Sequence, residues 1–433
     1  MSMSSSRRKF MKSAAALGAL PFLPPSLSAY AEPINSRPAI EAKKAGMPEE
    51  KQSIIGFYGP WAASLVEDPA LLSFRRNQWN DLEEWRAMAR GKMLELTAPP
   101  ETGGVPKVSI HKKYHYDGLD IEEMSWQLPY GRPTGAILLK PQGASGPLPA
   151  ILGLHDHGGN KYLGKRKITR VSDHTPDFVL EHQEQSYEGL AWANELARRG
   201  YVVLVHDAFA FGSRRVMYSD VSGIEWGPCN VEGKSDANPE DPENIQAYNS
   251  WAAEHEHILS KSLFCGGTTW PGVFLAEDIR ALDVLSARQD VDPDRIGCGG
   301  LSGGGLRTVY LAGADPRISC AVCAGFMSTW DDFLLNKAYT HTWMTYAPLL
   351  PRYLDFPEIL GLRVPLPTLI LNNSDDELYT MQGMTRAGEI LEELYLKAGA
   401  GDQCKTSYYP GPHKMDARMQ EEAFDWYDRW LKA

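Results

Sequence analysis

The feature that most constrains the fold is a regular alternation of short apolar runs with longer amphipathic segments from residue 148 to the end of the sequence. Apolar runs of strand length are found at residues 148–154, 201–205, 296–301, 318–324, 368–371 and 406–409. Segments with helical spacing lie between them, one of which carries Leu275, Ile279, Leu282 and Leu285. Because strands that alternate with helices of this length build βαβ units, we predict an α/β domain with a mostly parallel central sheet and flanking helices.

Three further extended runs precede this alternation. They cover residues 108–116, 119–128 and 134–139, and turn signals separate them, namely Asp117-Gly118 and Gly131-Arg132-Pro133. These runs favour an antiparallel start to the sheet. Upstream of them, residues 54–96 are rich in Trp, Leu, Glu and Arg and indicate a small helical segment, and prolines and glycines at 99–106 mark its end.

The first residues predict a cleavable signal. Arg7-Arg8 and nearby lysines precede an uncharged stretch at 13–30, and Ala29-Tyr30-Ala31 forms a small-x-small cleavage site. Residues 6–12 resemble the twin-arginine export signal, which implies a passage through the twin-arginine export machinery and a periplasmic or secreted protein. Prolines interrupt the uncharged stretch, so we expect cleavage after Ala31 and no stable membrane span in the mature form.

The predicted organisation therefore has three parts. It consists of a signal peptide at 1–31, a leader with a helical segment at 32–104, and an α/β domain at 105–433 enlarged by insertions at about 208–271 and 328–363. Long insertions in a compact domain are often functional lids.

Charge and cysteine content narrow the classes of function. The formal charge of −11 and the lack of a long basic tract outside the first dozen residues argue against a nucleic-acid partner. The six cysteines are too few to form the scaffold of a chain of 433 residues. Cys320 and Cys323 lie in an apolar run where they point to opposite faces of a strand, so we predict core packing. Cys229 and Cys265 fall in a loop-rich stretch, and their pairing stays open.

One motif carries the predicted chemistry. Gly300-Leu301-Ser302-Gly303-Gly304 leads from a predicted strand into a predicted helix and matches the nucleophile elbow G-x-S-x-G. The tight turn leaves no room for Cβ atoms and holds the serine backbone in a strained conformation with an exposed hydroxyl. The following helix begins under the serine and favours an oxyanion there. Ser302 is therefore the candidate nucleophile.

An acid and a histidine follow in the order that such a serine requires. Asp375 and Asp376 come after the strand at 368–371, and His413 comes after the strand at 406–409. A neutral imidazole would take the serine proton, and a carboxylate would orient the ring and stabilise the imidazolium. We favour Asp376 because it stands three residues after Asn373, at the acid position of a G-x-x-D turn. Asp375 is the alternative acid, or a cap for the next helix.

From about residue 105 to its end the chain resembles α/β-hydrolases of the dienelactone hydrolase and acetyl xylan esterase kind. The resemblance rests on the Ser302 elbow, the Asp376 and His413 tail, the turn at 207–213 (DAFAFGS) and the loop at 154–159 (LHDHGG). It implies an oxyanion hole formed by the backbone N–H of Gly303 and one near His157. The loop departs from the family pattern by an extra histidine and aspartate ahead of Gly158.

Other polar clusters favour structural roles. His155 and His157 have metal-ligand spacing on one face of a strand, but no third ligand is apparent, so we predict no metal. Residues 255–257 (His-Glu-His) indicate a solvated helix surface. Aromatic residues in the 328–363 insertion suit either stacking on a sugar or aryl group or packing of a lid onto the core.

These features together predict an exported serine hydrolase that cleaves a carboxylic ester without a cofactor. The resemblance suggests small acyl groups, with a small-molecule or carbohydrate ester as substrate. A serine peptidase of the prolyl-oligopeptidase kind is a rival, although the residues upstream of the sheet are too few for a propeller domain. The second rival hypothesis is a non-catalytic binding protein with the same fold.

Overall fold

The computed structural model describes residues 53–432. The predicted signal peptide and the polar leader at 32–46 lie outside the described residues.

The central element is a nine-stranded sheet with the order β1-β2-β3-β5-β4-β6-β7-β8-β9. Its first three strands and the β3–β5 pair are antiparallel, and all pairs from β5 through β4 to β9 are parallel. The strand bounds are β1 Val108–Tyr116, β2 Leu119–Trp126, β3 Thr134–Pro141, β4 Leu148–Gly153, β5 Val202–His206, β6 Val291–Leu301, β7 Ile318–Ala324, β8 Thr368–Asn373 and β9 Cys404–Tyr409. The predicted antiparallel start and the mostly parallel sheet are both confirmed.

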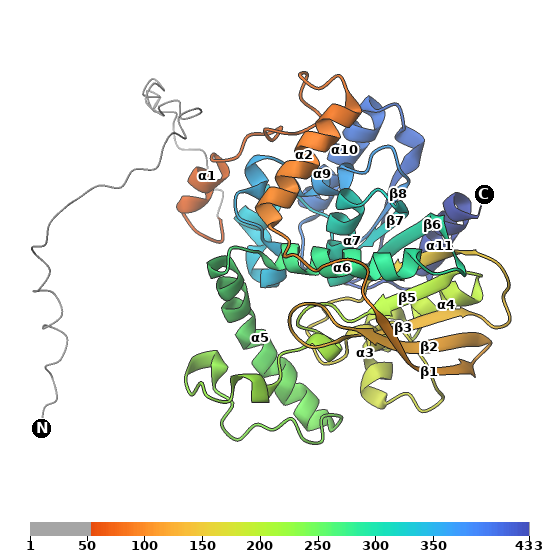
Figure 1. Cartoon of the computed structure of the whole chain (residues 1–433). Coiled ribbons are helices and arrows are strands. Elements are labelled where there is room, and N and C mark those ends of the chain that lie inside the picture. Colours follow the sequence, from red (N-terminus) through yellow and green to blue (C-terminus); the bar gives the residue numbers. More distant parts are fainter. Residues whose placement is uncertain (1–52, 433) are drawn as a thin grey trace, which may run out of the picture. The chain divides into compact units, whose positions relative to one another are not determined.

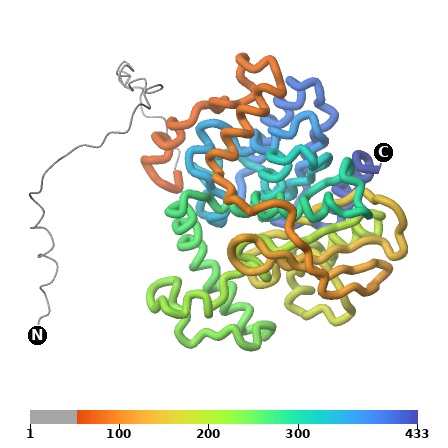
Figure 2. The backbone as a smooth tube through the Cα atoms, viewed as in Figure 1, coloured from red at the N-terminus to blue at the C-terminus, as the bar shows by residue number. Residues whose placement is uncertain are grey.

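Helices cover both faces of the sheet (Figure 1). The helices that contribute buried side chains to one face are α2 Leu82–Thr97, α6 Trp270–Ser286, α7 Gly303–Ala314, α9 Phe356–Gly361 and α10 Met381–Lys397. The opposite face carries α3 Asp177–Tyr187, α4 Trp192–Arg198 and α11 Ala417–Leu431. The remaining helices are α1 Tyr58–Ala63, α5 Pro242–Cys265 and α8 Trp330–Asp332, joined by several short 3-10 turns and a π-turn. The path of the chain between the two layers can be followed in Figure 2.

The N-terminal helical segment is part of the main core. Asp81 caps α2 by accepting hydrogen bonds from the amides of Glu83 and Glu84, which satisfies two of its first free N–H groups. The helix then buries Trp85 and Met93 completely, in the same apolar cluster as the sheet.

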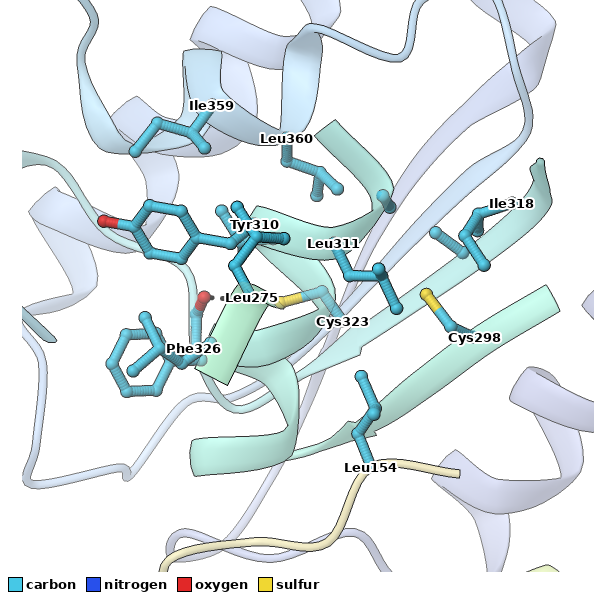
Figure 3. Packing of buried hydrophobic residues seen from close by; sticks show 14 of the residues in the cluster. Leu154, Leu275, Cys298, Tyr310, Leu311, Ile318, Cys323, Phe326, Ile359 and Leu360 are labelled. Carbon is cyan, nitrogen blue, oxygen red and sulfur yellow. Dashed lines mark hydrogen bonds between the residues drawn. The ribbon is translucent and has the colours of Figure 1, made fainter. Parts of the chain in front are cut away.

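The apolar core on the α7 side is continuous from strand to helix (Figure 3). Cys298 of β6 and Cys323 of β7 pack there among side chains of α6, α7 and α9, which include Leu275, Tyr310, Leu311, Ile359 and Leu360. Cys320 belongs instead to the cluster on the opposite face. The prediction that Cys320 and Cys323 point to opposite faces is confirmed, since a strand alternates its side chains.

The segment between β5 and α6 is more regular than its sequence suggested. It contains α5, a helix of 24 residues that begins at the cap residue Asp241 and extends away from the sheet (Figure 1). Tyr162, Tyr218, Tyr248 and Trp251 form a separate apolar cluster under this helix. Cys229, in the 3-10 turn Gly227–Cys229, and Cys265, at the end of α5, are both free thiols. Among the described residues no helix is both long and apolar enough to cross a membrane.

Candidate active site

Ser302 occupies the turn between β6 and α7. Its backbone has φ 56° and ψ −119°, a conformation that L residues rarely adopt. The turn is held by the Ser302 amide, which donates to the Ala324 carbonyl of β7 at 2.9 Å, and by the Ser302 carbonyl, which accepts from the Leu306 amide at 2.9 Å. The side chain is half-buried. This is the strained strand-to-helix turn that the glycine pattern predicts.

The glycines around Ser302 are required by close packing. A Cβ on Gly300 or on Gly304 would lie 2.0 Å from the carbonyl oxygen of Leu154 at the end of β4. A Cβ on Gly303 would lie 2.8 Å from the backbone nitrogen of His157. The elbow therefore fits directly against the 154–159 loop, and the backbone nitrogen of His157 lies beside Gly303. The Gly303 amide is the first of α7 and has no acceptor within the helix.

His413 and Asp376 are brought together by β8 and β9. The Nδ1 atom of His413 lies 2.6 Å from Oδ2 of Asp376, whose side chain is 1% exposed. The other ring nitrogen, Nε2, is buried and has no hydrogen-bond partner among the described residues. Because β6, β8 and β9 run parallel, their carboxyl ends place this pair and Ser302 at the same edge of the sheet.

The two neighbouring aspartates have different contacts. Asp376 also accepts a hydrogen bond from the Leu378 amide at 3.0 Å, which fixes its carboxylate under the imidazole. Asp375 is exposed and accepts from the Gly411 amide at 2.7 Å, so it closes the turn before His413. The cap of α10 is Thr380 and not Asp375.

A glycine and an aromatic group complete the surroundings of the imidazole. Gly325 has φ +57°, and a Cβ there would lie 3.0 Å from Cε1 of His413. His341, from the second insertion, packs edge-on against Phe333 and donates from Nε2 to the Leu378 carbonyl at 3.0 Å. Burial lowers the pKa of His341 to about 4, so this ring is neutral at physiological pH. The second insertion thus packs against the His413 side of the site.

The 154–159 loop is built on buried polar groups. The ring of His155 donates from Nδ1 to the Asp156 carbonyl and accepts at Nε2 from the Ala208 amide. Burial and the nearby Arg307 hold the pKa of His155 well below its usual range. These residues follow β4 in a loop, so the predicted placement of His155 and His157 on a strand is wrong, although both rings pack edge-on against Phe211. The described residues contain no group of His, Cys, Asp or Glu suited to a metal ion.

The prediction of a solvated surface at 255–257 is wrong. Glu256 on α5 is 6% exposed, and His255 is buried and stacks on Trp251 with ring centroids 4.8 Å apart. The Glu256 carboxylate accepts from Nε2 of His157 at 2.6 Å and from the ammonium of Lys161. It also accepts from the hydroxyl of Thr342 at 2.8 Å.

The charges in this cluster stabilise one another. Burial alone would raise the pKa of Glu256, but His157 and Lys161 hold it well below its usual range. Burial lowers the pKa of Lys161 and of His157, and Glu256 opposes both shifts. Glu256 therefore joins both insertions to the loop beside the elbow.

Sequence reasoning overlooked Glu256 and Lys161, although a signal for Glu256 exists. Apolar residues on α5 recur at helical spacing, and Ile245, Tyr248 and Ala252 all lie on its buried face. Continued along the helix, that spacing places His255 and Glu256 toward the protein and not toward solvent.

A mostly parallel sheet with helices on both faces and a serine at a strained strand-to-helix elbow defines the α/β-hydrolase fold, and this chain has it. Comparison with protein-family models finds no match. The chain is 29% identical to YtaP of Bacillus subtilis (strain 168), provisionally named a hydrolase, over 301 residues that cover 68% of this chain and 83% of YtaP.

Solved structures of esterases share the fold. One is a protein of Bacteroides fragilis NCTC 9343 provisionally named an acetyl xylan esterase, with a TM-score of 0.61 and 18% identity over 84% of each chain. Another is a glucuronoyl esterase from Solibacter usitatus, with a TM-score of 0.54 and 14% identity over 83% of this chain and 97% of the other.

Proposed function

We propose that the protein is a serine hydrolase that cleaves a carboxylic ester, with Ser302 as nucleophile, His413 as base and Asp376 as the orienting acid. One observation carries the proposal: the Asp376–His413 pair leaves Nε2 buried and without a partner in the described part of the chain, at the sheet edge where the Ser302 elbow lies. An imidazole that is fixed at Nδ1 and free at Nε2 is arranged to accept a serine proton.

In the first half-reaction the Ser302 oxygen attacks the acyl carbon while its proton passes to Nε2 of His413. Asp376 stabilises the imidazolium, and the amides of Gly303 and His157 hold the negative oxygen of the tetrahedral intermediate. Each such donor contributes about 10²- to 10³-fold in rate. The imidazolium then protonates the leaving alcohol, and an acyl-enzyme on Ser302 remains.

In the second half-reaction a water molecule takes the place of the alcohol. His413 removes one proton from it as the oxygen attacks the acyl carbon, and the same two amides hold the second tetrahedral intermediate. Collapse of that intermediate releases the carboxylic acid and returns the proton to Ser302. The residues in these roles supply every proton transfer, and the reaction as written uses no cofactor.

For the substrate we propose an ester of a small acyl group, with a carbohydrate ester as the first choice. This choice of substrate is supported by two solved structures that share the fold, one of which is named an acetyl xylan esterase and the other a glucuronoyl esterase. Within the second insertion Tyr339 is 73% exposed, which leaves its ring accessible for stacking on a sugar, and Trp343 is 39% exposed with the ammonium of Lys261 over its ring. We further propose that the two insertions act as lids, and that residues 1–31 direct export and are then removed.

The test is a rate comparison over acetyl-sugar, aryl, lactone and peptide substrates with wild type and Ser302→Ala. We expect ester turnover and labelling of Ser302 by a fluorophosphonate in wild type, and neither in the variant. Hydrolysis by Ser302→Ala at the wild-type rate would overturn the mechanism. A preference for peptides would support the peptidase, and a wild type inactive on all four classes would support a binding protein.

A further inference from the structure

A buried lysine donates hydrogen bonds to the backbone of the 154–159 loop, which lies beside the nucleophile elbow. Lys167 ends the short 3-10 turn Gly164–Lys167, and its side chain is 0% exposed. Its ammonium donates to the carbonyl oxygen of Asp156 at 2.7 Å and to that of His157 at 2.6 Å. The third contact of the ammonium is an ion pair with the Asp156 carboxylate, in which Nζ lies 3.4 Å from Oδ2. One charged donor thus binds two consecutive peptide groups, and Nδ1 of His155 donates to the first of them at 3.0 Å as well.

The first of these peptides sets the direction of the His157 N–H. The Asp156–His157 bond is trans, so its C=O and N–H point to opposite sides of one rigid plane. Since the Asp156 carbonyl points at Lys167, the His157 N–H points away from Lys167. The His157 nitrogen lies 2.8 Å from the Cβ position of Gly303, so it borders the elbow. Rotation of this peptide would turn the N–H away and break the bond to Lys167.

The charge of Lys167 makes the His157 N–H a stronger hydrogen-bond donor. Burial lowers the pKa of Lys167 to about 8, against the opposing effect of Asp156, so the group is an ammonium at pH 7. A charged donor on the carbonyl polarises the whole peptide group and makes its N–H a better donor. A buried ammonium carries a large desolvation cost, and the pairing with Asp156 and two carbonyls offsets it.

We infer that Lys167 is a positioning residue for transition-state stabilisation: it holds the His157 N–H toward the oxyanion of the acyl substrate. The inference rests on the proposed ester hydrolysis and deepens it. Lys167 acts through the backbone of His157, and its own side chain stays buried below the loop. Its removal should therefore weaken the binding of the tetrahedral species more than that of the ground-state ester.

The test compares Lys167→Met, an unbranched apolar side chain that is one atom shorter and carries no charge, with Tyr187→Phe. Tyr187 is equally buried, and its hydroxyl donates to Oδ1 of Asp156 at 2.6 Å and also meets the Asp156 backbone. Among the described residues, the charged donor to the Asp156 and His157 carbonyls is Lys167 and not Tyr187. For each variant we would measure kcat and KM for one aryl acetate, and the inhibition constant of a trifluoromethyl ketone, whose adduct with the serine carries an oxyanion.

For Lys167→Met we expect kcat to fall about 10- to 100-fold with KM within threefold of wild type, and affinity for the ketone to fall in parallel. Tyr187→Phe should change kcat less than threefold even where it lowers the melting temperature. A kcat for Lys167→Met equal to that of Tyr187→Phe, or an effect on KM alone, would overturn the inference while leaving wild-type hydrolysis intact. Wild type inactive on every ester would overturn the proposed function and this inference together.

If Lys167→Met does not fold, because the Asp156 carboxylate is left buried and unpaired, the comparison becomes Asp156→Asn against Asp156→Asn/Lys167→Met. Neither variant then buries a lone carboxylate. The double variant should lose at least a further tenfold in kcat relative to the single one. Equal kcat values would reject the positioning role.

Discussion

The carboxylate of Glu256 lies 2.6 Å from Nε2 of His157, and this contact ties the first insertion to the loop beside the nucleophile elbow. The same carboxylate accepts a hydrogen bond from Thr342 of the second insertion. One buried acid therefore connects three segments that are far apart in the chain. The arrangement couples the position of both insertions to the geometry next to Ser302.

Replacement of Glu256 by Gln should destabilise the protein. Lys161 would be left as a buried cation without its counter-charge, which costs about 3 kcal/mol in the free energy of unfolding. Chemical denaturation at pH 7 measures this loss. Glu254→Gln is the control, because Glu254 is exposed on the same helix and should change stability by less than 0.5 kcal/mol, roughly the limit for surface sites. Equal stabilities of the two variants would contradict the role of Glu256.

The stabilisation by Glu256 should depend on pH in one direction. Because the folded-state pKa of Glu256 is held below its ordinary value of 4.5, the unfolded chain binds a proton more readily than the folded one. The contribution is therefore fully present at neutral pH and is lost as the pH falls below about 4.5 toward the folded-state pKa. The stability difference between wild type and Glu256→Gln should shrink between pH 6 and pH 3. A difference that grows in acid would contradict this sign.

Asp376→Asn should lower kcat about 10³- to 10⁴-fold, because a neutral amide can hold the imidazole in the wrong tautomer. Asp375→Asn should cost less than tenfold, since the hydrogen bonds of that side chain within residues 53–432 join it to the Gly411 amide and to its own neighbour Ser374. Steady-state rates on one aryl ester provide the measurement. The reverse ranking would assign the acid to Asp375.

Gly325→Ala should reduce activity through His413. A methyl group there meets the ring at 3.0 Å and also strains a backbone with φ +57°. Gly399→Ala is a matched control, because Gly399 has φ +72° but nothing within 4 Å of its Cβ position. Both variants should lose about 1 kcal/mol of stability from the positive φ. Only Gly325→Ala should lose more than tenfold in kcat, and equal rates would show that the ring tolerates the methyl group.

Thiol reactivity should single out one cysteine. All six are free, and Cys265 is exposed. Burial raises the pKa of Cys320 and of Cys404 to about 12, so little reactive thiolate forms there at pH 8. Ellman titration of the native protein should show one fast thiol, and Cys265→Ser should remove it. Rapid reaction of Cys320 or Cys404 in addition would contradict the packing of β7 and β9.

The predicted export signal is tested in cells. Full-length protein expressed in a bacterium with a twin-arginine pathway should reach the periplasm with Glu32 as its first residue. Arg7→Lys/Arg8→Lys should leave the precursor in the cytoplasm, because the paired arginines are the part of the signal that the machinery reads. N-terminal sequencing of each fraction checks both. Export of the variant at the wild-type level would exclude this route.

Local patterns in the sequence determined the layered fold and the strand-to-helix elbow. Strand and helix periods are properties of neighbouring residues, and a glycine pattern around a serine predicts a tight turn without knowledge of the rest of the chain. The order of Ser302, Asp376 and His413 follows from the same reasoning, since the ends of parallel strands meet at one edge. Their joint catalytic role stays a prediction.

Tertiary structure alone decided which polar groups are buried and paired. Glu256 meets His157 across 99 residues of chain, and Lys167 meets the backbone of Asp156 and His157 across a turn that no periodicity describes. A charged residue on a helix is indistinguishable from a surface residue until the opposing segment is known. The energy of such a group depends on the partners that the fold brings to it. For that reason the sequence predicts a candidate site, while only the structure identifies the buried polar residues packed around it.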